Sequence, residues 1–141
     1  NPIDPISLAI AYGATFVART FSGDVKNMTE VVQKAIDHKG FALVDCLSPC
    51  VTYNKINTYD WFKERVYNLN AEGHDPKDLH AAFARAVEWP TVQRDRIPIG
   101  VFYRVEGVPT YEEQEPGLAK GPLAKQRLGI EDPDGLMAEF L

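Results

Sequence analysis

The chain has 141 residues, of which 45% are hydrophobic and 25% charged, a composition typical of a globular protein with a core of its own. Its formal net charge of -5 at pH 7 argues against unaided binding of nucleic acid, which requires a basic face. No apolar run approaches the roughly 20 residues of a membrane span, and two cysteines cannot form a disulfide framework, so we expect a reducing, cytoplasmic setting.

The first predicted elements are a helix and a strand. Asp4 followed by Pro5 is a strong helix start, with aspartate as the N-cap and proline at the first helical position. Gly13 can end this helix, and residues 14–19 then have the composition of a short strand.

A second helix and a second strand follow. Asn27 and Glu30 form a pair that resembles a capping box, and apolar residues recur at helical spacing up to Gly40. Residues 41–46 form an apolar run that predicts a buried parallel strand. The alternation of helix and strand over residues 5–46 therefore predicts an α/β fold with a parallel sheet.

Three further elements are predicted before residue 108. Thr58 caps a helix that extends to about Tyr67, and Asp75-Pro76 begins a helix that ends before Pro90. Residues 97–105 alternate as a strand, and Pro98 restricts that strand to a sheet edge or to a start at Ile99.

Residues 109–141 differ from the rest of the chain. They combine glutamates, several Pro and Gly residues and scattered leucines. We therefore divide the chain into an α/β domain over residues 1–108 and an acidic, Pro/Gly-rich extension over residues 109–141. A segment that wraps a partner or a neighbouring domain fits this pattern, as does a disordered end.

Both cysteines lie where the second strand ends. Cys46 continues the apolar run, so we expect it to be buried in the core. Cys50 follows Pro49 in the loop past the carboxyl end of the strand, where open α/β sheets place their ligands. A soft thiolate at this position suits an iron–sulfur cluster or copper better than a hard cation.

Two other interpretations of these cysteines stay open. Both thiols are inert if the chain is a metal-free α/β interaction module. They form a redox switch if Cys46 and Cys50 pair, although redox dithiols usually have two residues between them and this pair has three.

Other polar and aromatic residues are weaker candidates. The three histidines, His38, His74 and His80, are expected at the surface without a metal. Lys26 and Lys55 could bring positive charge to the edge that carries Cys50. An aromatic group is expected to build a satellite core under the cysteine loop or to shield a redox centre; its members are Tyr53, Tyr59, Trp61, Phe62 and Tyr67.

Several of these runs together resemble the β subunit of the 2-oxoacid:ferredoxin oxidoreductases. The resemblance extends over residues 1–113, and Ser48-Pro49-Cys50 in its context is its most specific element. The segments that carry it are residues 13–19, 21–24, 40–54, 57–66 and 97–103.

The resemblance implies a fold, an activity and a site. The fold would be the second half of a three-layer domain that binds thiamine diphosphate and Mg²⁺. The intact enzyme would oxidatively decarboxylate a 2-oxoacid, release an acyl-CoA and pass electrons through a [4Fe–4S] cluster to ferredoxin. Its partners would be the remaining half of the β subunit, the α subunit, ferredoxin, CoA and the 2-oxoacid. Cys50 would be the last of four cluster cysteines, and Cys46 has no counterpart.

Two family features are absent from the sequence. The Gly-Asp-Gly…Asn motif that holds Mg²⁺ and diphosphate is missing, and so are three of the four cluster cysteines. We therefore expect the C-terminal half of a β subunit that is divided within its domain. Because one thiolate cannot hold a [4Fe–4S] cluster, this polypeptide alone is expected to be inactive and free of a cluster.

Overall fold

The structure is a computed structural model that describes residues 3–89, 95–126 and 133–138. It divides into two compact units, residues 1–110 and residues 111–141, and each is described by itself. No helix among the described residues has both the length and the apolar character needed to cross a lipid bilayer.

The first unit is built around a four-stranded mixed sheet. The strands are β1 (Phe16–Phe21), β2 (Ala42–Leu47), β3 (Val66–Asn68) and β4 (Ile97–Arg104). Their order is β2-β1-β4-β3, with β1–β2 and β3–β4 parallel and β1–β4 antiparallel. The predicted parallel pairing of the first two strands is confirmed, and the antiparallel partner β4 was not predicted.

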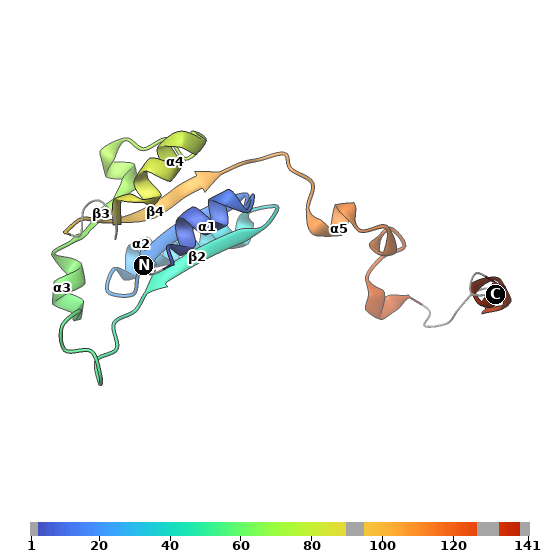
Figure 1. The fold of residues 1–141 in the computed structure, drawn as a ribbon, viewed down its shortest axis with the longest axis horizontal. Coiled ribbons are helices and arrows are strands. Elements are labelled where there is room, and N and C mark those ends of the chain that lie inside the picture. The colour runs from blue at the N-terminus through green and yellow to red at the C-terminus, as the bar shows by residue number, and fades with distance from the viewer. Residues whose placement is uncertain (1–2, 90–94, 127–132, 139–141) are drawn as a thin grey trace. The chain divides into compact units, whose positions relative to one another are not determined.

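Helices cover both faces of this sheet (Figure 1). On one face, α1 (Pro5–Ala11) and α4 (Leu79–Ala86) pack on β1 and β4 through Ile6, Ala82, Val17 and Phe102. On the other face, Val31 of α2 (Val25–Asp37) packs against Phe16, Ala18 and Val101. The unit therefore has the three layers of an α/β fold, as predicted.

Helix caps confirm some predicted starts and correct others. Asp4 caps α1 through the Ile6 and Ser7 amides, and Thr58 caps α3 (Tyr59–Lys63). The predicted start of α2 at Asn27 is wrong, because Asp24 is the cap and accepts from the Asn27 amide at 3.0 Å. The Asn27 side chain is instead buried, and its amide oxygen accepts from the Thr20 hydroxyl at 3.0 Å.

Two further boundaries differ from prediction. The helix that begins after Thr58 ends at Lys63 rather than near Tyr67, and the short strand β3 follows it. The N-cap of α4 is Asp78, which accepts from the His80 and Ala81 amides, rather than Asp75.

The prediction that Pro98 restricts its strand to an edge is wrong. β4 lies between β1 and β3, and it begins at Ile97, whose amide donates to the Arg65 carbonyl at 2.9 Å. Phe102 is an extra residue opposite the step from Val17 to Ala18, which makes a β-bulge. The nearby Gly100 has φ +111°, a backbone conformation that favours glycine. Central placement explains why most of β4 is buried instead of alternating.

The second unit consists of short helical segments. They are α5 (Tyr111–Gln114), single 3₁₀ turns at Pro116–Leu118 and Leu123–Lys125, and α6 (Pro133–Ala138). The side chain of Gln126 donates through Nε2 to the carbonyls of Gly117 and Gly121, at 2.6 Å each. No side chain described in residues 111–126 is buried, so this stretch has local order without a core.

Candidate functional site

The loop after β2 is held by hydrogen bonds among its own residues. The Asn54 amide donates to the Cys50 carbonyl at 3.0 Å, and the Asn54 side chain accepts from the Ile56 and Asn57 amides at 3.0 and 2.9 Å. The Lys55 ammonium group donates a hydrogen bond to the Val51 carbonyl at 2.6 Å. These bonds fold residues 50–57 into turns that fix the backbone of Cys50 beyond the end of the strand.

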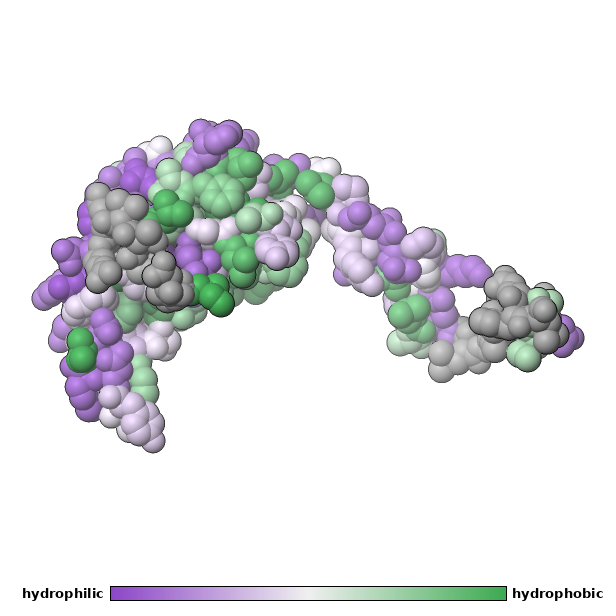
Figure 2. Space-filling view, in the orientation of Figure 1, coloured by the Kyte–Doolittle hydropathy of each residue, from purple (hydrophilic) through white to green (hydrophobic). Residues whose placement is uncertain are grey.

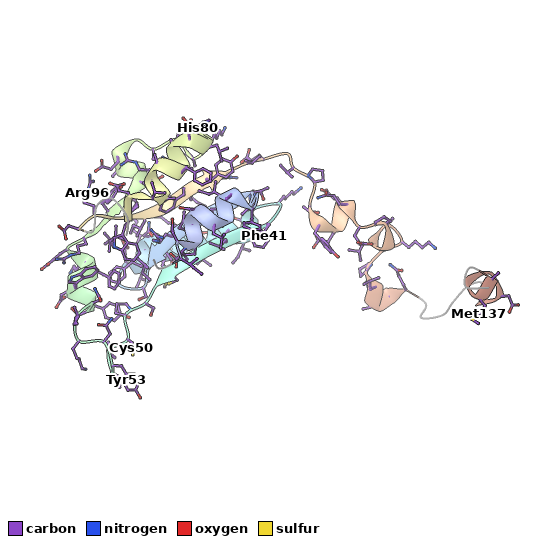
Figure 3. The ribbon with its side chains drawn as sticks, in the orientation of Figure 1. Phe41, Cys50, Tyr53, His80, Arg96 and Met137 are labelled. Carbon is purple, nitrogen blue, oxygen red and sulfur yellow. The ribbon has the colours of Figure 1, made fainter. Side chains whose placement is uncertain are left out.

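Cys50 is an exposed, free thiol three residues past the last residue of β2 (Figure 3). The backbone N–H groups of Tyr53 and Thr52 donate to its sulfur and lower the pKa of the thiol. A lower pKa favours the thiolate, which is the form that binds a metal. Cys50 thus combines an accessible position with an environment that suits a metal ligand.

The prediction that Cys46 is a buried core residue is wrong, because its side chain is exposed. β2 is the last strand of the sheet on its side, and all of its residues are half-buried or exposed. The sequence shows an apolar run but does not show which strand lies at the edge.

A hollow of about 260 Å³ opens beside Cys50. Its lining residues come from the cysteine loop and the start of α3: Pro49, Cys50, Val51, Asn54, Lys55, Thr58, Tyr59 and Asp60. The second lysine candidate, Lys26, is exposed in the first turn of α2 and is not among these lining residues. Of the two lysines, only Lys55 therefore lies in the immediate surroundings of the thiol.

The predicted aromatic cluster forms only in part. Phe62 stacks on Phe21 with ring centroids 5.6 Å apart, Tyr59 lies 5.7 Å from Phe21, and Trp61 packs edge-on against Phe62 at 4.9 Å. Phe21 is the last residue of β1, so these contacts fasten α3 to the carboxyl end of that strand. Tyr53 is 89% exposed and takes no part.

Tyr67 belongs to a separate polar network on β3 and α4. Its hydroxyl donates to the buried Glu88 carboxylate, and Arg85 lies 3.4 Å from that carboxylate. Burial first, and then the Glu88 hydrogen bond and charge, raise the pKa of Tyr67 to about 12. Tyr67 therefore remains a neutral donor near neutral pH, and the network fastens β3 to the end of α4.

Two of the three histidines are half-buried rather than at the surface. His74 contacts the Phe102 carbonyl through Nε2 at 2.7 Å, and His38 contacts the Thr15 hydroxyl at 2.9 Å. Burial, followed by the nearby Arg104 charge, lowers the pKa of His38, so this ring favours its neutral form. His80 is exposed, as predicted.

Arg19 is a buried charge that the sequence reasoning did not identify. Its Nε donates to Asp45 at 2.7 Å, and a terminal nitrogen lies 3.3 Å from Asp4. Its guanidinium carbon lies 5.1 Å from the centre of the Trp89 ring and 5.5 Å from that of Phe102. This one residue of β1 therefore contacts the cap of α1, the neighbouring strand β2 and Phe102 of β4. The sequence signal that could have identified Arg19 is a charged residue inside an otherwise apolar strand.

The described part of the chain offers too few ligands for a metal by itself. Across residues 3–89, 95–126 and 133–138, no group of three or more His, Cys, Asp or Glu side chains could hold a metal ion.

Comparison with known families identifies two matching regions. A model that describes the C-terminal region of the pyruvate ferredoxin oxidoreductase β subunit matches residues 50–120, half of the chain. A model described as "Thiamine pyrophosphate enzyme, C-terminal TPP binding domain" matches residues 1–46. The boundary between the two falls in the loop that carries Cys50.

Similarity to individual proteins agrees with these two family matches. The chain is 45% identical over 120 residues to a 2-oxoacid:ferredoxin oxidoreductase subunit β of a Sulfolobus species, covering 81% of this chain and 39% of that protein. It is 41% identical over 145 residues to the Saccharolobus solfataricus subunit of the same name, covering 93% of this chain and 46% of that protein. The chain thus spans less than half the length of these relatives.

A solved structure resembles the whole chain. It is a 2-oxoglutarate:ferredoxin oxidoreductase from Magnetococcus marinus with 2-oxoglutarate, coenzyme A and succinyl-CoA bound. The TM-score is 0.76 at 31% sequence identity, covering 99% of this chain and 45% of the other.

Proposed function

Because this chain belongs to the β-subunit family of the 2-oxoacid:ferredoxin oxidoreductases, we propose that it provides the C-terminal half of such a subunit. The intact enzyme would oxidatively decarboxylate a 2-oxoacid, form an acyl-CoA and reduce ferredoxin. Within it, residues 1–108 complete the domain that binds thiamine diphosphate, and residues 109–141 form an extension.

The observation that carries this proposal is the placement of Cys50. Its thiol is exposed in a loop beyond β2 that is held by hydrogen bonds among its own residues, and backbone N–H groups lower the pKa of the thiol. Such a thiolate is suited to iron, and four of them hold a [4Fe–4S] cluster. We assign Cys50 as one ligand, with the other three supplied from outside this chain.

The organic cofactor depends on residues outside this chain. When bound, thiamine diphosphate would supply a nucleophilic ylid and a thiazolium ring that stabilises carbanions. The Gly-Asp-Gly…Asn motif for Mg²⁺ and diphosphate is absent from the sequence, so we derive no step through the cofactor from these residues. The contribution that we propose for this chain is structural support and one cluster thiolate, in a cytoplasmic enzyme that also contains an α subunit.

Activity of a joined polypeptide tests the function. The chain would be attached at residue 1 to the part of the Saccharolobus solfataricus β subunit that precedes the matched region, and expressed with the α subunit of that enzyme. We expect ferredoxin reduction that requires both a 2-oxoacid and CoA, and no such activity from the 141-residue chain alone. An assembled protein that contains iron and thiamine diphosphate yet oxidises no 2-oxoacid would contradict the proposal.

Lys26 and Lys55 are proposed contacts for an anionic partner, either acidic ferredoxin or a CoA phosphate. Replacing Lys26 with glutamate is expected to slow ferredoxin reduction by the joined enzyme several-fold at low ionic strength, because steering between opposite charges raises association rates. Iron content should not change. Lys34→Glu, also exposed but near the other end of α2, is the matched control. Equal rates for the two variants at low salt would remove Lys26 from the interface.

A further inference from the structure

Lys55 binds to the backbone of the loop that carries Cys50. Its ammonium group donates to the Val51 carbonyl at 2.6 Å, although the side chain is exposed. Figure 2 shows hydrophilic surface beside this loop, which Cys50 and Tyr53 mark in Figure 3. A lysine in such a position usually extends into water, because its ammonium is strongly hydrated and its stem is flexible. The contact instead fixes a positive charge against the residue that directly follows Cys50.

One peptide group connects this charge to the Cys50 sulfur. The oxygen of that group is the Val51 carbonyl, which accepts from Lys55, and its nitrogen belongs to Thr52. The Thr52 N–H in turn donates to the Cys50 sulfur. The ammonium, the peptide group and the sulfur therefore form a continuous hydrogen-bonded chain. Hydrogen bonds in such a chain polarise and strengthen one another, so a charge at one end acts on the acceptor at the other.

The turn after Cys50 explains why backbone amides point at its sulfur. The Asn54 amide donates to the Cys50 carbonyl at 3.0 Å, so residues 51–53 make a single turn of helical type. An N-cap side chain accepts from the amides two and three positions after it. Cys50 has the same relation to Thr52 and Tyr53, whose N–H groups both donate to its sulfur. The backbone provides these donors, and a charge bound to the same backbone changes their strength.

We propose that Lys55 is a positioning residue that raises the reduction potential of the cluster to which Cys50 contributes a thiolate. This inference rests on the proposed function, which supplies the cluster. Reduction adds one electron and therefore one negative charge, and hydrogen bonds to the sulfurs help to set the potential of such clusters. A cation that strengthens the bond to the Cys50 sulfur stabilises the reduced form more than the oxidised form.

The hollow beside Cys50 contains charges of both signs. Lys55 and Asp60 are the two charged residues among those that line it, and Asp60 lies in the first turn of α3. The Asp60 side chain is exposed and lies outside the hydrogen-bonded loop of residues 50–57. We therefore expect Asp60 to lower the potential by less than Lys55 raises it, because solvent and salt screen an exposed charge.

A reductive titration of the joined enzyme with dithionite tests the proposal by a readout other than activity. Electron paramagnetic resonance measures the reduced cluster. At the midpoint of the parent, Lys55→Met should lower the ratio of reduced to oxidised cluster at least threefold, and each tenfold change corresponds to about 59 mV for a one-electron couple. Lys55→Arg, which keeps the charge, should stay near the parent, and Asp60→Asn should shift the midpoint upward. Lys63→Met, at an exposed position of α3 that does not line the hollow, is the matched control.

The other outcomes overturn the proposal in distinguishable ways. An unchanged midpoint in Lys55→Met with full iron content overturns it even if ferredoxin reduction slows, because Lys55 would then be a partner contact alone. Equal shifts in Lys55→Met and Lys55→Arg, or loss of iron in both, would show that the shape of the side chain matters and its charge does not. An active parent enzyme with a flat series leaves the proposed function intact, whereas a parent that binds no iron overturns both.

Discussion

Under the proposed function, replacing Cys50 with alanine is expected to abolish the iron–sulfur cluster of the joined enzyme. A [4Fe–4S] cluster takes four cysteine thiolates, and removal of one leaves an iron without its protein ligand. We expect iron to fall from about four atoms per cluster to a small fraction of that value. Ferredoxin reduction should fall to background, while the fold is retained because the side chain is exposed. Iron analysis and the thiolate-to-iron absorbance measure the effect.

Cys46→Ala is the matched control for this change. Both cysteines are exposed and free, and they lie four positions apart. If Cys50 is a cluster ligand, the Cys46 variant keeps its iron and its activity. Equal iron in both variants would favour the metal-free interaction module. Loss of function in both variants, with a disulfide detected by thiol titration in the parent chain, would favour the redox switch.

Signals that act over a few residues predicted the structure well. Asp4 before Pro5 and Thr58 before Tyr59 were correctly identified as helix caps, because a cap is made by one side chain and the amides that directly follow it. The alternation of helix and strand gave the parallel pair β1–β2 for a similar reason, since a short crossover leaves few ways to connect two strands. Cys50 was placed correctly past the end of β2 from this local pattern alone.

Features that depend on the order of strands in the sheet could not be predicted in the same way. Cys46 was expected inside the core because it ends an apolar run, yet β2 lies at an edge of the described sheet. Pro98 suggested an edge, yet β4 lies between β1 and β3. A strand shows its own apolar pattern in sequence but not its neighbours, and β3 has only three residues from which to show any pattern.

Arg19 shows how a long-range contact escapes sequence reasoning. Its partners Asp4 and Asp45 lie 15 positions before it and 26 after it. The register of β1 against β2 puts Arg19 opposite Asp45, and the packing of α1 on the sheet brings its cap Asp4 to the same guanidinium. These contacts join the start of α1 and the edge strand β2 to the centre of the sheet.

Arg19→Ala is accordingly expected to destabilise the 141-residue chain by about 3–5 kcal/mol, the usual cost of removing one partner of a buried ion pair. The side chain is fully buried, so its loss leaves a cavity, and the Asp4 and Asp45 side chains, only 16% and 22% exposed, lose their cation. Urea unfolding followed by circular dichroism measures the change as a shift in midpoint.

Arg96→Ala provides the comparison, because Arg96 pairs with Glu72 at 3.0 Å but both side chains are more than 40% exposed. Such exposed pairs contribute about 0–1 kcal/mol, so this variant should unfold close to the parent midpoint. A double-mutant cycle with Asp45→Ala then separates the contribution of the ion pair from the cost of the cavity. Free-energy changes at independent sites add, whereas residues in direct contact show a coupling energy. Two results would contradict this account: Arg19→Ala lowers the free energy of unfolding no more than Arg96→Ala does, or the cycle shows no coupling. In either case the buried guanidinium does not hold α1 and β2 to the centre of the sheet.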